Sequence, residues 1–453
     1  MNIRSLLGLG RDVKRISLFG LGVSNLEILK EMTDNVEIVL RSDAVIDKRK
    51  FGHDGRIVAI YDGARVCEDI CEDVIIFSPS VRRDRAELLQ ARERGVLMTS
   101  DCELFSSSNN APIFAVTGSD GKSTSATLIS KLLAEHFSSV ALCGNIGVPM
   151  LSAPRSDAYA VELSSFQLTY SRVHATRAGI TNITPNHLNW HKSFEEYRDV
   201  KLSLADSADE YALCCDDGVC LEYLKRQGAH AVFSAERSHD ELKSKYGFSL
   251  SYTLEGEHIC RCGEPYIALS DILRSEKYNL KNLMLALCVC DGYVTEKHAR
   301  RVAREFSGLP HRLELVGELD GVRYFDSSID TSPSRTISTL SSVDAHCVVI
   351  LGGRKKGIPL EPLLPIMKKR ARAAVVMGEC KEELLTLLSN DVACIPAENM
   401  RDAVRAAANA AMRGDCIILS PAATSYDSYN SFSERGDDFK KQVNEYINAS
   451  KCK

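Results

Sequence analysis

Residues 116–124 (VTGSDGKST) constrain the fold of this chain more than any other stretch. The apolar residues 113–116 predict a buried strand before them, and the apolar spacing of residues 127–133 predicts a helix after them. A glycine-rich turn between a strand and a helix points backbone N–H groups at an anion. Lys122 is placed to reach terminal phosphates, and Ser123 or Thr124 to ligate Mg²⁺. The sequence therefore predicts a shortened phosphate-binding loop, in which Val116 occupies the first glycine position of the longer pattern.

The size and charge of the chain indicate a large enzyme rather than a nucleic-acid or membrane binder. Its 453 residues predict about three domains. The 56 basic and 61 acidic residues give a net charge of −5, so no general basic field attracts nucleic acid or anionic lipid. Apolar runs such as 345–351 are too short to span a bilayer, and no N-terminal signal core is evident. The 16 cysteines lack the C-x₂-C spacing of metal sites. We expect free thiols and a cytoplasmic protein.

Strands and helices alternate through the first 105 residues, which predicts a parallel sheet. Strands are expected at 15–19, 36–40 and 74–77, with a helix at 26–32. The glycines at 20 and 22 suggest a dinucleotide site, but Asn25 replaces the third glycine and Arg41-Ser42 replaces the acidic ribose contact. A different phosphorylated ligand is better supported, with Arg41, Ser42 and Ser78 on the rim at the strand ends. The alternative is a structural domain whose glycines only make turns.

The middle of the chain places further candidates behind predicted strands. A strand at 158–161 delivers Glu162, a carboxylate suited to phosphate-bound Mg²⁺. A strand at 178–181 leads to His187, which is either a metal ligand or an ordinary histidine. The predicted helix 195–204 contains Lys201, whose simplest interpretation is a solvated helix face. Asn279 opens an apolar helix at 283–289, where it would act as a cap.

Residues 216–275 are less informative, and we expect the hydrophilic segment 238–245 at the surface. A third region begins near residue 308. It has predicted strands at 322–325, 347–351, 374–377 and 416–419, and a helix at 401–412. Polar residues again follow the strands, at 326–328, 352–357 and 420–425.

With these segments placed, the chain resembles the Mur ligases, the ATP-dependent amide-forming enzymes of peptidoglycan synthesis. The likeness covers nearly the whole chain, and it is carried by residues 117–124, 144–147, 162–168, 186–187, 197–202, 309–312, 326–327, 420–422 and 432–436. It implies three α/β domains with mainly parallel sheets. Residues 1–105 would form a Rossmann-like domain for the UDP end of the substrate, residues 106–307 a P-loop ATPase-like domain for ATP and metals, and residues 308–453 a Rossmann-like domain for the incoming amino acid.

The run 162–167 (ELSSFQ), with Ser425 and Phe432, points to the member that adds D-glutamate. The resemblance then implies that ATP phosphorylates the carboxylate of UDP-N-acetylmuramoyl-L-alanine and that the D-glutamate amine attacks the acyl phosphate. Two Mg²⁺ ions would neutralise the charge that builds up. The partners expected are these two substrates, without nucleic acid or membrane, and the chain is expected to be a monomer.

The resemblance also implies a role for individual residues. Catalysis is assigned to Lys122, His187 and Lys201, with the metals on Ser123, Glu162, His187 and a Lys201 carbamylated by CO₂. The ATP contacts are Gly118, Ser119, Asp120, Gly121, Lys122, Ser123, Thr124, Asn279, Arg312 and Asp326. The contacts expected for the UDP-linked substrate are Gly22, Val23, Ser24, Arg41, Ser42, Ser78, Asn145, Ser164 and Gln167. The amino-acid contacts are Lys356, Ser425 and Phe432.

The sequence departs from the family pattern at three places. Tyr278 replaces the histidine that usually precedes the Asn279 position, Asn186 stands where an aspartate can precede the metal histidine, and segment 326–336 is one residue longer than in some relatives. Two alternatives remain. One is a sibling activity: the alanine- or diamino-acid-adding ligase or a folylpolyglutamate synthetase. The other is a nucleotide-binding scaffold, which would not need a complete metal set.

Overall fold

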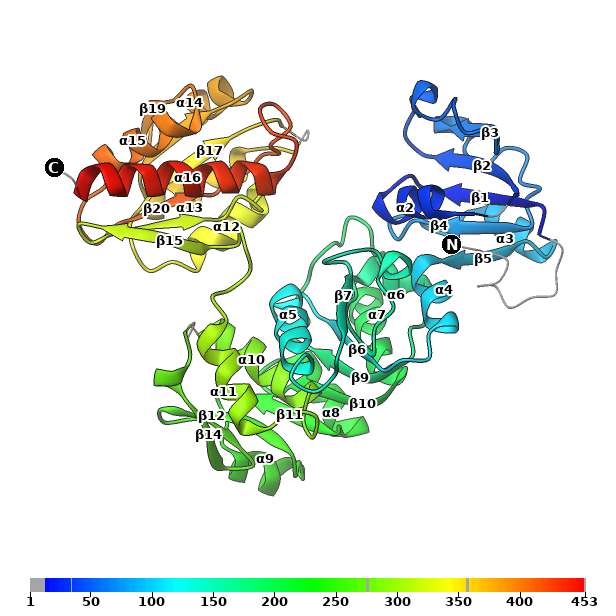
Figure 1. Cartoon of the computed structure of the whole chain (residues 1–453), viewed down its shortest axis with the longest axis horizontal. Coiled ribbons are helices and arrows are strands. Elements are labelled where there is room, and N and C mark those ends of the chain that lie inside the picture. Colours follow the sequence, from blue (N-terminus) through cyan, green and yellow to red (C-terminus); the bar gives the residue numbers. More distant parts are fainter. Residues whose placement is uncertain (1–12, 34, 274–276, 356–357, 452–453) are drawn as a thin grey trace. The chain divides into compact units, whose positions relative to one another are not determined.

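The computed structural model describes residues 13–33, 35–273, 277–355 and 358–451. The chain divides into two compact units, Met1–Phe306 and Ser307–Lys453. Unit 1 contains a five-stranded and a nine-stranded sheet, and unit 2 a six-stranded sheet, with helices between the strands (Figure 1). These mainly parallel sheets confirm the predicted α/β class. The border expected near residue 105 stays a prediction, because both sheets before residue 306 belong to one unit.

The first sheet is entirely parallel, with strand order β3-β2-β1-β4-β5. Its order reverses between β1 and β4, the switch point at which doubly wound sheets bind ligands. The strands are β1 (Arg15–Phe19), β2 (Glu37–Ser42), β3 (Ile57–Asp62), β4 (Val74–Phe77) and β5 (Leu97–Ser100), and the helices are α2 (Val23–Glu31), α3 (Ala86–Glu93) and α4 (Asp101–Ser108). The expected strands at 15–19 and 74–77 are confirmed residue for residue.

The second sheet has strand order β14-β13-β12-β11-β10-β9-β6-β8-β7. Its strands are β6 (Ile113–Thr117), β7 (Val140–Gly144), β8 (Ala158–Glu162), β9 (Ala175–Ile180), β10 (Ala208–Cys214), β11 (Ala231–Ser234), β12 (Ser251–Glu255), β13 (His258–Arg261) and β14 (Glu264–Ala268). Its helices are α5 (Lys122–Leu133), α6 (Ser165–Tyr170), α7 (Phe194–Asp206), α8 (Gly218–Gln227), α9 (His239–Tyr246), α10 (Lys277–Val289) and α11 (Glu296–Glu305). The pairings of β12 with β13 and β13 with β14 are antiparallel. Residues 238–245, expected at the surface, form most of α9, which buries His239 and Leu242.

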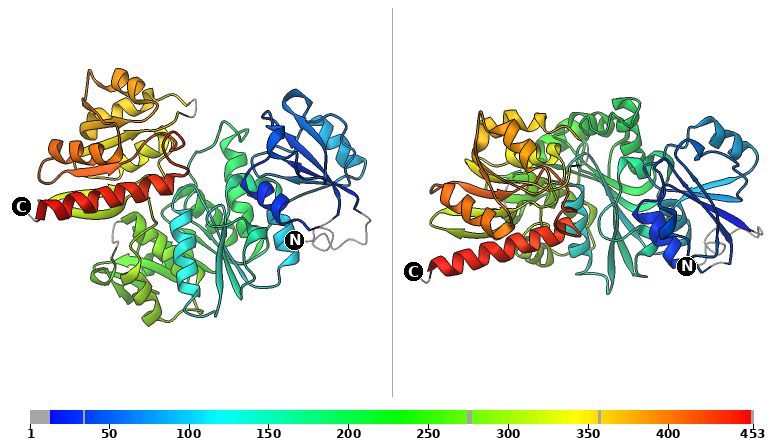
Figure 2. Two further views of the ribbon diagram at one scale, coloured as in Figure 1. Left: turned by 45° about the horizontal axis from the view of Figure 1, so that its top comes forward. Right: turned by 90° about the horizontal axis from the view of Figure 1, so that it is seen from above.

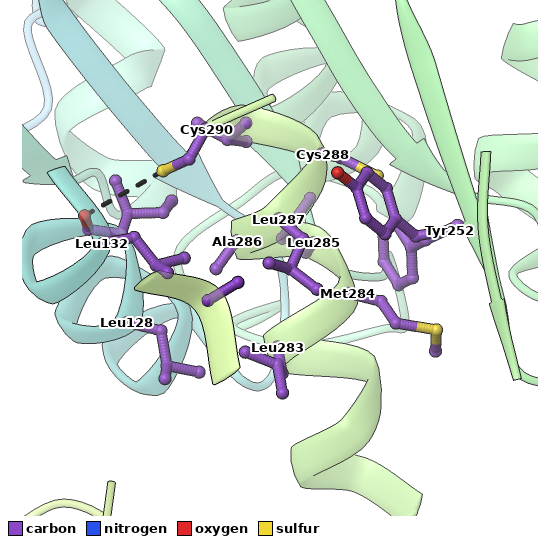
Figure 3. Packing of buried hydrophobic residues seen from close by; sticks show 14 of the residues in the cluster. Leu128, Leu132, Tyr252, Leu283, Met284, Leu285, Ala286, Leu287, Cys288 and Cys290 are labelled. Carbon is purple, nitrogen blue, oxygen red and sulfur yellow. Dashed lines mark hydrogen bonds between the residues drawn. The ribbon is translucent and has the colours of Figure 1, made fainter. Parts of the chain in front are cut away.

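Helix α10 packs against α5 and against strands β9–β12, while α5 itself lies on β6, β7 and β8, so α10 supports the helix that follows the phosphate loop. Figure 3 shows Leu128 and Leu132 of α5 beside Leu283–Cys290, with Tyr252 of β12 on the other side. The Cys290 thiol points at the carbonyl of Ile129, with a sulfur–oxygen distance of 4.0 Å. Within the described residues every cysteine is free, as expected. The buried ones, such as Cys288 and Cys290, act as small apolar side chains.

Unit 2 has strand order β15-β16-β20-β17-β18-β19, parallel except for the β15–β16 hairpin. Its strands are β15 (Glu314–Leu319), β16 (Val322–Asp326), β17 (Cys347–Gly352), β18 (Ala371–Met377), β19 (Ala393–Pro396) and β20 (Cys416–Leu419). Its helices are α12 (Pro333–Ser341), α13 (Leu364–Arg370), α14 (Lys381–Leu388), α15 (Met400–Ala410) and α16 (Phe432–Lys451). Helix α16 is a single long rod in both views of Figure 2 and buries Phe439 and Val443 against the sheet. In the described part of the chain, no helix is both long and apolar enough to span a membrane.

Candidate active site

The predicted phosphate loop connects the end of β6 to the start of α5, which confirms the strand, turn and helix read from the sequence. Gly118 and Gly121 have φ values of +145° and +82°. A Cβ on Gly118 would lie 1.8 Å from Thr181 Oγ1, and one on Gly121 would lie 2.2 Å from Asn282 Oδ1. Only glycine fits both positions, so the tight turn is built into the sequence.

The loop is held by hydrogen bonds that leave its helix end suited to an anion. Ser119 N donates to Asn182 O at 2.8 Å, and Lys122 Nζ donates to Ser119 O at 2.7 Å. Gly121 is the N-cap of α5 and supplies no side-chain cap. Uncapped N–H groups and the helix dipole favour a phosphate at this end. The loop therefore has the cradle that a nucleotide phosphate needs.

Glu162 ends β8 beside the loop, and its side chain is the best candidate for a cation ligand. It is 1% exposed, and its Oε1 accepts a 2.6 Å hydrogen bond from Asn145 Nδ2. Its Oε2 is buried and, among the described residues, has no hydrogen-bond partner. A buried carboxylate oxygen without a donor is destabilising unless a cation or water meets it. Oxygen ligands are those that Mg²⁺ prefers, so the donor set fits this ion.

Lys201 of α7 is 1% exposed, which corrects the interpretation that it lies on a solvated helix face. Its Nζ donates to Gly118 O at 2.6 Å and lies 3.4 Å from Thr117 Oγ1. Burial, with the nearby Lys122 charge, pushes the pKa of Lys201 well below its usual value. A neutral amine can react with CO₂, and the carbamate would keep one N–H for the Gly118 carbonyl. The surroundings of Lys201 thus fit the modification that the resemblance implies.

His187 lies in the exposed loop after β9, in the left-handed region at φ +54°. Its carbonyl accepts from Trp190 N at 2.9 Å and from His191 N at 3.0 Å. Its ring meets the edge of Phe166, with centroids 4.9 Å apart. The loop therefore turns sharply at His187 and keeps the imidazole near α6. The metal role of this histidine stays a prediction.

The sequence interpretation missed two buried residues beside this loop. His191 is 2% exposed, its Nε2 lies 3.0 Å from Ser165 Oγ, and burial lowers its pKa. Asn282 lies against Gly121, and its Oδ1 accepts from Ser125 Oγ at 3.3 Å. A second histidine in a polar loop and an asparagine in an apolar helix give little signal, because their partners are distant in sequence.

The turn after β1 packs on Ser78 at the switch point of the first sheet. A Cβ on Gly22 would lie 2.7 Å from Ser78 Oγ. Asn25, which replaces the third glycine, donates through Nδ2 to the carbonyls of Phe19, Gly20 and Ile76. The asparagine thus ties the turn to β4. Of the predicted ligand residues, Val23 and Ser24 open helix α2 directly after Gly22, Ser42 ends β2, and Ser78 follows β4.

Arg41 requires a correction, because it does not present its charge at the rim. The side chain is fully buried, and its guanidinium donates to Glu72 Oε1 at 2.7 and 2.9 Å. It also donates to the carbonyls of Val66, Glu68 and Asp69. With these donors committed inside the domain, Arg41 stabilises the fold, and we leave it out of the proposed substrate contacts.

Three further predicted substrate residues lie around Glu162 and α6. Asn145 is exposed, and its side chain donates to Glu162 Oε1. Ser164 and Gln167 form a reciprocal capping box at the start of α6, with Ser164 N donating to Gln167 Oε1 at 2.9 Å. The capping box explains these two residues structurally, so their contact with substrate stays a prediction.

The remaining nucleotide candidates are divided between the units. Asn279 lies inside the first turn of α10, which begins at Lys277, so it is not the cap expected from the sequence. In unit 2, Arg312 is exposed and Asp326 is buried. Asp326 Oδ2 lies 2.7 Å from His311 Nδ1. His311, Glu314 and Asp326 could together hold a cation, but Lys440 Nζ already lies 3.1 Å from Glu314.

The predicted amino-acid site lies where the strands of unit 2 end. Ser425 is buried after β20, and Phe432 begins α16 with its ring 6.1 Å from that of His311. Lys356 lies outside the described residues. In the sequence Arg435 is only one member of the 432–436 motif, yet its buried guanidinium donates to Ser328 Oγ and to the carbonyls of Ser328, Gly352 and Ala423. It joins the three loops that surround the predicted site.

Comparison with known proteins agrees with this geometry. A family model described as the Mur ligase middle domain matches residues 116–290. The UDP-N-acetylmuramoylalanine–D-glutamate ligase of Ruminiclostridium cellulolyticum is 33% identical over 96% of this chain and 97% of its own length. The enzyme of that name from Acetivibrio thermocellus is 34% identical over 82% of each chain.

Solved structures extend the likeness to the fold. The UDP-N-acetylmuramate–alanine ligase of Thermotoga maritima superposes with a TM-score of 0.58 at 15% identity, over 96% of this chain and all of that one. At that identity the likeness shows the fold alone. The sequence identity to the curated relatives, sustained over almost the full length of both chains, settles the family: this chain belongs to the Mur ligases.

Proposed function

We propose that this chain joins D-glutamate to UDP-N-acetylmuramoyl-L-alanine at the expense of ATP, in peptidoglycan synthesis. The observation that carries the proposal is the phosphate loop with two buried groups beside it. Glu162 has an oxygen with no hydrogen-bond partner among the described residues, and burial lowers the pKa of Lys201. The names of the relatives that match along the whole chain give the substrates. We expect the enzyme to act as a cytoplasmic monomer.

The chain's own residues would divide the work as follows. Backbone N–H groups at 118–124 and Lys122 would bind the phosphates of ATP and stabilise the charge on the transferred group. Ser123 and Glu162 would hold one Mg²⁺, and His187 and Lys201 the other. When bound, these ions would neutralise the charge between phosphate and the approaching carboxylate. Lys201 would act after its neutral amine bonds to CO₂ and releases a proton, which turns a buried cation into an anionic oxygen ligand.

The second half of the reaction would use unit 2. The substrate carboxylate, once phosphorylated, is attacked by the D-glutamate amine, and the tetrahedral intermediate releases phosphate. Ser425, Phe432 and Lys356 would bind D-glutamate. Two carboxylates must each find donors, so an inverted or shorter acceptor leaves one group unpaired. The need to pair both carboxylates would favour D-glutamate over L-glutamate and D-aspartate.

The test measures phosphate release by the purified protein with ATP, Mg²⁺ and UDP-N-acetylmuramoyl-L-alanine, with one amino acid added at a time. D-glutamate should support turnover far better than L-glutamate, D-aspartate, L-alanine or a diamino acid. Comparable kcat/KM with L-alanine or the diamino acid would move the protein to a sibling activity. No release with any acceptor would favour the scaffold alternative.

A matched variant tests the phosphate loop itself. Lys122→Ala should abolish phosphate release, because it removes the charge that meets the transferred phosphate. The unfolding temperature should stay close to that of the native protein, since the Lys122 side chain is partly exposed. An active Lys122→Ala protein would refute the assignment of this loop as the ATP site.

A further inference from the structure

The segment after β4 contacts the loop that contains His187, although about 110 residues separate them in sequence. Arg82 Nη1 donates to Trp190 O at 3.0 Å, and Trp190 Nε1 donates back to Ser80 O at 2.9 Å. The Arg82 guanidinium also lies over the indole ring, 4.8 Å from its centroid. The two segments are thus joined by reciprocal hydrogen bonds and a cation–π contact.

Ion pairs extend this contact on both sides. Arg82 Nη2 lies 3.2 Å from Glu196 Oε1, and Glu196 is in the first turn of α7, the helix that carries Lys201. Asp84 pairs with Arg82 at 2.9 Å and with Lys192 at 2.8 Å. We call this set the Arg82 bridge: Ser80, Arg82 and Asp84 on one side, and Trp190, Lys192 and Glu196 on the other.

Each side of the bridge lies next to a different part of the proposed site. Ser80 is two residues after Ser78, at the rim expected to hold the UDP end of the substrate. Trp190 donates through its backbone N–H to the carbonyl of His187 at 2.9 Å. A shift of the 78–84 segment on ligand binding would therefore displace the His187 loop through short, directional contacts.

We propose that Arg82 is a positioning residue that couples binding of the UDP-linked substrate to the placement of the loop carrying His187. The inference rests on the proposed function for the identity of the ligand. The bridge lies wholly within unit 1. The contacts of Arg82 in the described part of the chain are with Asp84, Trp190 and Glu196, so it would act through these residues.

The chain has a single tryptophan, so its fluorescence reports on the bridge directly. Indole emission depends on the charge above the ring and on the Nε1 hydrogen bond, and Arg82 and Ser80 supply these two. The experiment adds UDP-N-acetylmuramoyl-L-alanine to the full chain without ATP or Mg²⁺, and follows Trp190 emission while calorimetry measures binding. In the native protein, emission should change in proportion to occupancy.

Arg82→Ala should bind the UDP substrate with a Kd within roughly threefold of the native value, yet lose most of the emission change. The control is Arg94→Ala, an arginine of the same sheet region whose guanidinium donates to Ile70 O. This control should keep the full response. Binding with an unchanged response in Arg82→Ala would overturn the inference and leave the proposed function standing. No binding by the native protein would overturn the proposed function, and this inference with it.

Kinetics separate positioning from general stabilisation. A displaced His187 loop should lower kcat by roughly tenfold, with a smaller change in KM for the UDP substrate. Misplaced groups stabilise the transition state less well, while substrate binding is largely kept. Arg82→Lys keeps the charge but not the forked geometry of the guanidinium, so its kcat should lie between those of the native protein and Arg82→Ala. If Arg82→Ala fails to fold, Trp190→Phe should show the same fall in kcat, because it removes the Nε1–H that donates to Ser80 O and changes the ring under Arg82. Native kcat in Arg82→Ala, or in Trp190→Phe where Arg82→Ala does not fold, would refute the role.

Discussion

Two buried basic side chains, one in each unit, lie under loops at the ends of parallel strands, and we infer different roles for them. Lys201 in unit 1 is 1% exposed, and Arg435 in unit 2 is 3% exposed. Each donates to backbone carbonyls: Lys201 to Gly118, and Arg435 to Ser328, Gly352 and Ala423. Similar burial therefore surrounds a lysine in one site and an arginine in the other.

The difference lies in what each side chain can become. The planar Arg435 guanidinium spreads its donors over three loops, and burial lowers its pKa only to about 10, so it stays charged at neutral pH. Burial pushes the pKa of Lys201 well below its usual range. The lysine can therefore become a neutral nucleophile towards CO₂, whereas the arginine can only hold loops together. We infer that Lys201 and the groups around it (the Lys201 region) take part in the reaction. Arg435 and the loops that it joins (the Arg435 region) have a structural role.

The largest effect should follow from replacing Lys201 by a residue that cannot react with CO₂, including the arginine found in the other unit. Lys201→Ala and Lys201→Arg should each lower turnover by about a hundredfold or more, because neither can form the carbamate. A short carboxylate in the buffer should restore part of the activity of Lys201→Ala by supplying the missing oxygens, and none in Lys201→Arg. The measurement is phosphate release at saturating substrates, with Lys225→Ala, an exposed lysine on α8, as control.

Near-native turnover in Lys201→Arg would break the comparison. The residue would then be an electrostatic phosphate contact, and the second metal would need another ligand.

A second prediction uses the unpaired oxygen that distinguishes the Lys201 region. Glu162→Gln replaces a buried carboxylate by a neutral amide. The Oε2 of that carboxylate has no hydrogen-bond partner within the described structure. Turnover should fall by about a hundredfold, since a metal ligand is lost. The unfolding temperature should stay or rise, because a buried carboxylate is destabilising without its cation. Calorimetry without Mg²⁺ and turnover across a Mg²⁺ series measure the two effects, and a fall in both would indicate a structural role instead.

The sequence predicts the parts of this fold whose cause is local. The strands at 15–19 and 74–77 are apolar blocks between polar turns, and the phosphate loop depends on glycines that have no substitute. Long-range burial is harder to predict. Arg41 looks like a rim cation because its partner Glu72 lies 31 residues away.

The burial of Lys201 also depends on residues distant in sequence, so the local pattern does not predict it. Helix α7 (FEEYRDVKLSLAD) reads as polar, so the burial of its lysine depends on the loop after β6. Residues 216–275 are less informative in sequence, because β11 and β13 are four residues each and α9 is largely charged. In each case the missing information is a contact between distant segments rather than a local pattern.

The third prediction tests the architectural role of Arg435. Arg435→Met leaves the carbonyls of Ser328, Gly352 and Ala423 without their donor, and should lower the free energy of unfolding by about 2–4 kcal/mol. The KM for D-glutamate should rise more than kcat falls, because the loops that would bind this substrate loosen. Thermal unfolding and steady-state kinetics measure both. Arg323→Ala, an exposed arginine on β16, is the control, and equal effects in the two variants would remove the case for a clamp.

The smallest effect concerns Asp330, a buried acid in the Arg435 region. Burial raises its pKa, although Ser420 Oγ donates to its Oδ2 at 2.7 Å. A raised pKa in the folded state means that the unfolded chain ionises first as the pH increases. Stability from this group is therefore fully present below the unfolded pKa, and it is lost as the pH rises through the folded pKa. Asp330→Asn does not titrate, so its unfolding temperature relative to the native protein should increase from pH 4 to pH 8. If the difference in unfolding temperature did not depend on pH, burial would not raise the pKa of Asp330, and the prediction would be wrong. A change in the KM for D-glutamate alongside the stability change would place this acid in the binding site, and the Arg435 region would then no longer be purely architectural.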